Sequence, residues 1–171
     1  MYAFVIMPNH IHIIWQQLKK NGKETVQGSF LKYAAHELLK KLKATGESVQ
    51  YEVNAANKKH EIWQRDSLSI ETYSRRVAKE KLDYIHFNPV SGVWKLSKDD
   101  LDYYYSSAGF YETGVDDFGF LNDCIANLMG TDMNCFVCHE PRRSGVLMIG
   151  LRIKPKKIFL SGKPFPFLFV S

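Results

Sequence analysis

The chain of 171 residues has no apolar run that approaches the roughly 20 residues of a membrane-spanning helix. Its first segment also lacks the basic start of a secretory signal, because Met1 to Gln16 contains two histidines and no lysine or arginine. Cysteine is scarce, with three residues, and an odd count argues against a disulfide framework. From these absences we expect a cytoplasmic protein without a membrane span, whose cysteines are reduced.

Apolar and aromatic residues are plentiful. They make up 45% and 13% of the chain, which excludes a disordered protein and suffices for one ordinary core. Positive charge gathers toward both ends: residues 1–60 carry a net charge of +5 and residues 121–171 carry +4, whereas residues 61–120 carry −4. This distribution is compatible with a polyanionic partner, although many basic proteins bind no nucleic acid.

Two elements are predicted in the first part of the chain. β-favouring residues predict a buried strand from Tyr2 to Trp15, and Pro8-Asn9 is expected to introduce a bulge or bend in it. Helical periodicity predicts a helix that begins at Ser29 and is ended by Gly46.

The later segments are less uniform. Residues 44–60 are polar and predict a loop. A second helix is expected to start near Ser69 and to stop before Pro89, because the residue before a proline is disfavoured in the α conformation. Residues 146–153 and 158–170 are apolar without a clear period, so the sequence does not place them in the core.

His10 and His12 are the first candidate site. Residues at i and i+2 of a strand project from the same face, about 6 to 7 Å apart, so two imidazoles could ligate one ion there. Two histidines do not complete a coordination shell, and imidazole suits several divalent ions. An ordinary structural role for the pair therefore stays open.

Tyr84 and Asn88 are the second candidate pair. Positions i and i+4 of one helix share a face, which puts a phenol one turn from a carboxamide at the helix end. A tyrosine oxygen can attack phosphorus, and an asparagine oxygen can complete a set of metal ligands. Taken alone, the pair could equally be a core tyrosine and a helix stop before Pro89.

Two longer strings contain these candidates. Tyr2 to Trp15, with MPNHIH, and Leu82 to Val90, with YIHFNPV, resemble the two signatures of the REP-associated tyrosine transposases, which belong to the HUH superfamily of single-tyrosine, single-strand DNA transposases. Shorter matches occur in order between and after them. They are Ile62-Trp63-Gln64-Arg65, Gly92-Val93, Tyr105-Ser106-Ser107 and Asp116-Asp117-Phe118-Gly119.

The resemblance covers residues 1–122 and implies a transposase-like domain there, followed by a C-terminal extension of unknown structure at residues 123–171. It implies a metal-dependent nuclease and strand transferase that acts in DNA transposition. By position in the motifs, His10, His12 and Asn88 match the metal site, for which Mg²⁺ or Mn²⁺ is expected. Tyr84 matches the nucleophile, which forms a 5′-phosphotyrosine link and releases a 3′ hydroxyl.

The implied partner is single-stranded or hairpin DNA, bound by a monomer or by a homodimer, and no membrane is involved. Unpaired DNA is expected to lie on a cationic track with aromatic faces. Arg65, Arg75 and Arg76 are the candidate DNA-binding residues, and a solvated helix face is the competing interpretation of each. Tyr103, Tyr104 and Tyr105 are rival nucleophiles by residue type, but they lack the amide one turn later.

The fold expected from the resemblance is α+β, with a ferredoxin-like antiparallel sheet, the histidine strand central and two helices on one face. Members usually carry a strand and a helix ahead of the histidine strand, and we expect both to be missing here. The backbone groups on one side of that strand would then be unpaired, each costing about 1 to 3 kcal/mol. A catalytically inactive DNA-binding remnant is therefore the first alternative, and a replacement strand from the tail is a further idea.

The second alternative is a small metal-binding module in the C-terminal extension. Cys135-Phe136-Val137-Cys138-His139 matches the pattern of covalent haem attachment, but no export signal accompanies it. Cys124 could join these residues in a Cys₃His zinc set.

Overall fold

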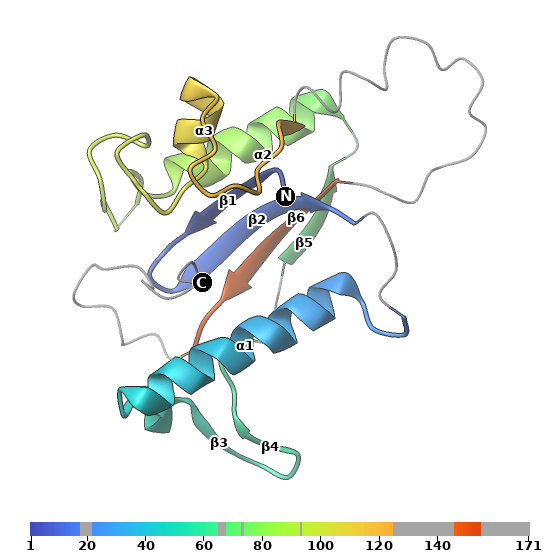
Figure 1. Cartoon of the computed structure of the whole chain (residues 1–171), viewed down its shortest axis with the longest axis vertical. Helices are drawn as coiled ribbons and strands as arrows, with labels where there is room; N and C mark the ends of the chain where they lie inside the picture. Colours follow the sequence, from blue (N-terminus) through green and yellow to red (C-terminus); the bar gives the residue numbers. More distant parts are fainter. Residues whose placement is uncertain (18–21, 65–67, 73, 93, 125–145, 155–171) are drawn as a thin grey trace.

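The computed structural model describes residues 1–17, 22–64, 68–72, 74–92, 94–124 and 146–154. These residues form a mixed α+β arrangement in which an antiparallel sheet lies between helices (Figure 1). The sheet holds four strands in the order β1-β2-β6-β5. Their bounds are Ala3–Ile6 (β1), His10–Gln16 (β2), Leu68–Thr72 (β5) and Val146–Arg152 (β6).

The stretch predicted as one strand is a hairpin of β1 and β2. Val5 pairs with His12 and Ile6 with Ile11, and the N–H of Met7 donates to the carbonyl of His10 at 2.8 Å. Pro8 has no N–H to give to a ladder, so the chain reverses there instead of bending within one strand.

The histidine strand β2 has neighbours on both sides, so the expected unpaired edge is absent. Strand β6 pairs with β2 in the antiparallel direction, with His10 opposite Arg152 and Gln16 opposite Val146. On its other side β6 pairs with β5. The segment 146–153, which the sequence left unplaced, therefore contains an interior strand of the sheet, drawn red between β2 and β5 in Figure 1.

Helix α1 spans Val26–Ala44 and begins three residues earlier than predicted. The Thr25 hydroxyl accepts a hydrogen bond from the N–H of Gly28 at 3.0 Å, which caps the helix start. Beyond the helix end, Gly46 has a φ of 77°, a conformation that glycine adopts at little cost.

The second helix, α2, spans Arg75–Phe87 and begins later than predicted, because residues 68–72 form β5. The Ser74 hydroxyl caps α2 by accepting from the N–H of Val77 at 3.3 Å. Asn88 is the C-cap residue of α2, so the helix ends before Pro89, as predicted. The α2 side chains buried against the sheet are Ala78, Leu82, Ile85 and His86.

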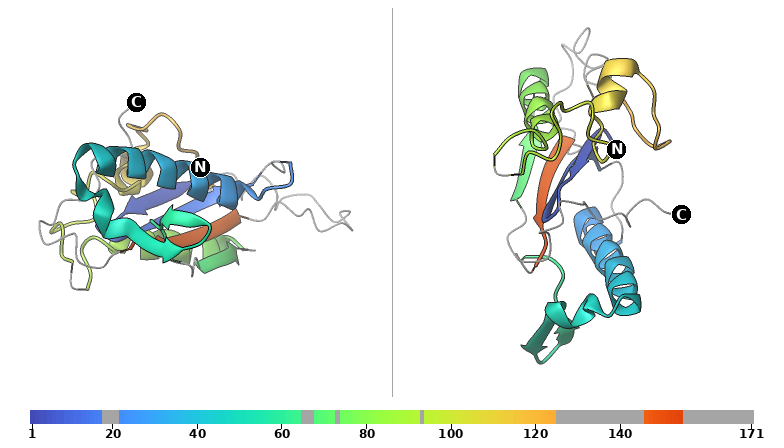
Figure 2. Two further views of the ribbon diagram at one scale, coloured as in Figure 1. Left: turned by 90° about the horizontal axis from the view of Figure 1, so that it is seen from below. Right: turned by 90° about the vertical axis from the view of Figure 1, so that its left-hand side faces the viewer.

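The two long helices cover opposite faces of the sheet, and the expectation of two helices on one face is wrong (Figure 2). In β2, Ile14 belongs to the core under α2, whereas Ile11 and Ile13 belong to the core that includes Phe30 of α1. Since side chains alternate along a strand, burial of both sets requires a cover on each face.

The remaining elements lie at the periphery of the sheet. The region predicted as a polar loop contains a 3₁₀ helix, Glu47–Tyr51 (η1), and a hairpin of β3 (Glu52–Ala55) and β4 (Lys58–His60). Helix α3 spans Ala108–Thr113. In the described part of the chain, every helix is too short or too polar to cross a membrane.

Candidate active site

The side chains of His10 and His12 project from the face of β2 that α2 covers. Their ring centroids lie 5.0 Å apart with the rings at 75°, and Ile11 between them is buried on the other face. The prediction that the two imidazoles share a face is confirmed.

The end of α2 brings Tyr84 and Asn88 to this pair. The Tyr84 ring lies edge-on to His12 with centroids 5.6 Å apart, and Tyr84 is 54% exposed. The amide nitrogen of Asn88 donates to the backbone carbonyl of Tyr84 at 2.7 Å, and the Asn88 side chain also hydrogen-bonds His10. The four candidates therefore meet at one place, although the two pairs are far apart in the sequence.

These residues line a cleft of about 650 Å³. Strand β6 contributes Gly150, Leu151 and Arg152 to its wall. The full lining is His10, His12, Gln64, Tyr84, Asn88, Ser91, Gly92, Trp94, Gly150, Leu151 and Arg152.

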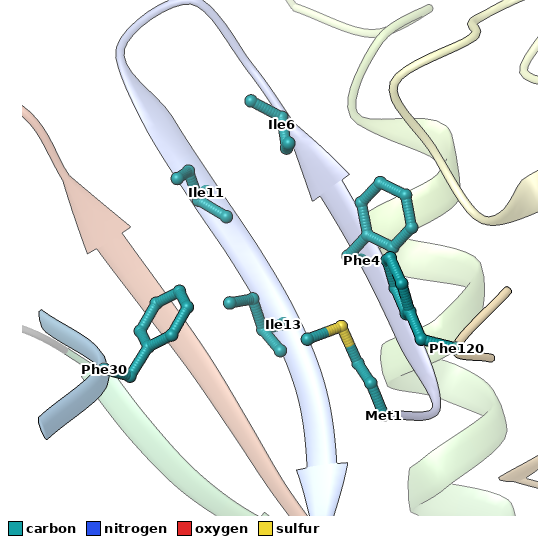
Figure 3. Close-up of a pocket in the computed structure, with 7 residues that line it drawn as sticks. All are labelled: Met1, Phe4, Ile6, Ile11, Ile13, Phe30 and Phe120. Carbon is teal, nitrogen blue, oxygen red and sulfur yellow. The ribbon is translucent and has the colours of Figure 1, made fainter. Parts of the chain in front are cut away.

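A second pocket lies on the opposite face of the sheet, toward α1, and has a different character. Its lining is entirely apolar (Figure 3), and consists of Met1, Phe4, Ile6, Ile11, Ile13, Phe30 and Phe120. It carries no group suited to acid–base or metal chemistry, so the polar cleft is the candidate site.

Burial keeps both imidazoles of the cleft neutral near neutral pH. It lowers the pKa of His10, an effect that the hydrogen bond to Asn88 opposes and the charge of Arg152 reinforces. Burial, with the charges of His10 and Arg152, lowers the pKa of His12 to about 4. Neutral imidazole is the form that binds metal ions.

The donor set of the cleft fits a divalent ion. Asn9 Oδ1 lies 2.6 Å from His10 Nδ1, an outer hydrogen bond that leaves Nε2 as the ligand atom of His10. The buried Nδ1 of His12 has no hydrogen-bond partner in the described structure. With its amide nitrogen on Tyr84, Asn88 turns its oxygen toward His10, so this oxygen lies beside the imidazoles. Within the described ranges no three His, Cys, Asp or Glu side chains form a metal-binding group, so a third donor beside the two histidines would have to be of another type, such as the Asn88 amide oxygen.

Of the three predicted DNA-binding arginines, the two that the structure describes do not line the cleft. Arg75 and Arg76 are exposed in the first turn of α2, about 12 to 14 Å along the helix axis from Tyr84, and Arg76 pairs with Glu80 at 3.1 Å. Arg65 lies outside the described residues. So do Cys135, Cys138 and His139, whereas Cys124 is a buried free thiol.

Sequence reasoning missed several residues of the cleft. Gln64 and Gly92 were present only as parts of matching strings, and Trp94 was not singled out. Arg152 lies in a segment without periodicity, and its place opposite His10 follows from the strand register alone.

No protein family matches this chain, and comparisons with curated proteins and with solved structures found no match. The motif resemblance is therefore an inference from the residues themselves.

Proposed function

We propose that the protein is a metal-dependent, tyrosine-mediated nuclease and strand transferase that acts on single-stranded or hairpin DNA in transposition. The observation that carries the proposal is the convergence of His10, His12, Tyr84 and Asn88 in one cleft. The two pairs come from separate motif strings, and nothing in the local spacing of either string requires them to meet.

The sheet supports a ferredoxin-like interpretation of the fold. Its histidine strand is central and all pairings are antiparallel. In this interpretation β6 takes the place beside β2 that the expected first strand would occupy, and α1 is an additional cover on the far face.

Tyr84 is the nucleophile in this proposal. Its half-exposed side chain can meet a phosphodiester that enters the cleft, and its edge contact with His12 orients the phenol toward the ligand set. The bond from the tyrosine oxygen to phosphorus forms as the bond from phosphorus to the 3′ oxygen breaks. The phenol gives its proton to solvent and the departing 3′ oxygen takes one up, so a 5′-phosphotyrosine and a free 3′ hydroxyl result.

His10, His12 and Asn88 would hold a Mg²⁺ or Mn²⁺ ion. Such an ion polarises a non-bridging phosphate oxygen and stabilises the charge that develops during in-line displacement. The residues themselves position the phosphate: Asn88 lies between His10 and the backbone of Tyr84, so the ligand set and the nucleophile share one support.

The rival tyrosines are engaged elsewhere. Tyr103 is buried and donates to the carbonyl of Ile6 at 2.7 Å. Tyr104 is 63% exposed, and its ring lies 5.5 Å from that of Phe118 and outside the cleft. Tyr84 is the tyrosine that lines the cleft within the described chain.

Covalent capture of DNA tests the proposal. Purified protein is incubated with labelled single-stranded hairpins and Mn²⁺, and a denaturing gel is examined for a protein–DNA adduct. We expect an adduct from the wild type and from Tyr104→Phe, and none from Tyr84→Phe. Absence of an adduct from folded protein across varied hairpins and ions would contradict the proposal and favour the inactive DNA-binding remnant.

A further inference from the structure

Arg152 contributes a positive charge to the wall of the cleft. It is the last residue of β6 and the cross-strand partner of His10, so both side chains lie on the face covered by α2. Arg152 is exposed and lines the same cleft as Tyr84. Among the described lining residues it carries the only formal charge when the two imidazoles are neutral, and none of them is a carboxylate.

The guanidinium of Arg152 also has no counter-ion in the described part of the chain, in contrast to two other cations. Lys154, two residues later, pairs with Glu61. On α2, Arg76 pairs with Glu80. An exposed arginine that faces a polar cleft and is not neutralised by a carboxylate leaves a positive potential inside that cleft.

We propose that Arg152 binds a phosphate of the DNA strand that occupies the cleft and so positions the strand against Tyr84. This inference rests on the proposed function only in that single-stranded DNA enters the cleft. A guanidinium presents a planar fork of N–H donors that matches two phosphate oxygens. The segment that resembles no known motif thus supplies the anion-binding group of the site.

Binding of a labelled 12-nucleotide oligothymidylate, followed by fluorescence anisotropy without metal across a salt series, tests this role. We expect Arg152→Gln to weaken binding about tenfold and to lower the slope of log K against log salt by about 0.7, the value for one single-strand phosphate contact. Arg152→Lys keeps the charge and restores most of the slope. Lys59→Gln removes an exposed, ion-paired cation of β4 that does not line the cleft and is the matched control, with affinity and slope unchanged.

Two further measurements separate a phosphate contact from structural damage. Removal of a positive charge beside the imidazoles leaves Mn²⁺ affinity unchanged or raises it, whereas a disturbed site would lose affinity for both DNA and Mn²⁺. The midpoint of urea unfolding of Arg152→Gln is expected to match that of the wild type, because the side chain is exposed.

The inference is overturned if Arg152→Gln binds oligothymidylate with the wild-type affinity and salt slope, if the wild type binds none, or if the variant loses Mn²⁺ affinity or stability together with DNA. An Arg152-dependent salt slope without any Tyr84 adduct supports the phosphate contact and contradicts the nuclease. An adduct with no dependence on Arg152 supports the nuclease and contradicts the phosphate contact.

Discussion

The Nε2 atom of His86 lies 2.8 Å from the Oγ atom of Ser107, and both side chains are buried. The Ser107 hydroxyl also accepts from the N–H of Phe4 at 3.0 Å and donates to the Phe4 carbonyl at 3.2 Å. Since the single hydroxyl proton goes to that carbonyl, His86 is the donor to Ser107. This network joins α2 to β1 two residues after Tyr84, so it holds the helix of the candidate nucleophile against the sheet.

Replacement of Ser107 by alanine should lower the free energy of unfolding by about 2 to 3 kcal/mol, because the hydroxyl makes three buried hydrogen bonds and His86 would face a methyl group. Urea unfolding measures the change. Ser69→Ala, at an exposed position of β5, should change it by less than about 0.5 kcal/mol. Equal effects of the two variants would contradict a structural role for the network.

Acid should destabilise the protein before its carboxylates are protonated. Burial lowers the pKa of His86 from its ordinary 6.5 to about 4, so the neutral form is the folded form. Stability is complete above pH 6.5 and falls as the pH drops toward 4, because only the unfolded chain takes up the proton in this window, at roughly 1 kcal/mol per pH unit. We expect urea unfolding between pH 7 and 5 to show a slope to which the buried His10 and His12 also contribute, and His86→Gln to reduce that slope by roughly 1 kcal/mol per pH unit. Val115→Ala, at an exposed residue without a titratable side chain, should leave it unchanged.

Binding of Mn²⁺ should persist in mild acid. The pKa of His12 is lowered to about 4, chiefly by burial, so the imidazole is still neutral at pH 5. Isothermal titration at pH 7 and pH 5 should therefore show a much smaller fall in Mn²⁺ affinity than two imidazoles with ordinary pKa values would give, which is roughly several hundredfold. A fall of that size would contradict the prediction. His12→Ala should abolish binding, and His36→Ala should retain it.

Phe87 should contribute to DNA binding although sequence reasoning passed over it. It is 61% exposed and lies three residues after Tyr84, so the two rings are neighbours on the helix surface. Stacking of one base on an aromatic ring contributes about 1 to 3 kcal/mol. Phe87→Ala should weaken oligothymidylate binding about tenfold without a change in stability. Tyr33→Ala removes an exposed ring from α1, on the other face, and should have no effect.

Because β6 lies in the interior of the sheet, truncating its buried side chains should greatly lower the free energy of unfolding. Ile149 is 1% exposed and pairs with Ile13 of the histidine strand. Ile149→Ala should lower the free energy of unfolding by about 3 kcal/mol. Val115→Ala, at a residue that is 59% exposed, is the matched control and should cost less than about 0.5 kcal/mol. A small effect at Ile149 would contradict the placement of β6.

The spacing of residues along the sequence was sufficient to predict that the two members of each candidate pair share a face. A period of two placed His10 and His12 on one face, and a period near four placed Tyr84 and Asn88 on one side of α2. The meeting of the two pairs was implied only by the motif resemblance. It depends on the packing of α2 over β2, which no spacing within either string encodes.

The sequence did not reveal strand β6 and placed the start of α2 too early, and both outcomes have physical causes. Strand β6 showed no alternation because it is covered on both faces: Met148 belongs to the core under α2, and Ile149 and Leu151 belong to the core under α1. The start of α2 was placed too early because Ile70 falls in phase with the helical period, although it lies in β5. Periodicity does not register the cap at Ser74 that begins the helix.

The position of β6 also sets the order in which the protein can be built. This strand follows every other described strand along the chain, yet it lies between β2 and β5. During synthesis the β1–β2 hairpin emerges first, with one edge of the histidine strand open to pairing with other chains until β6 arrives. Such a long-range pairing makes for slow folding. Arg152 can therefore join the imidazoles only after β6 has been synthesised, so a shorter nascent chain carries Tyr84 without the completed cleft.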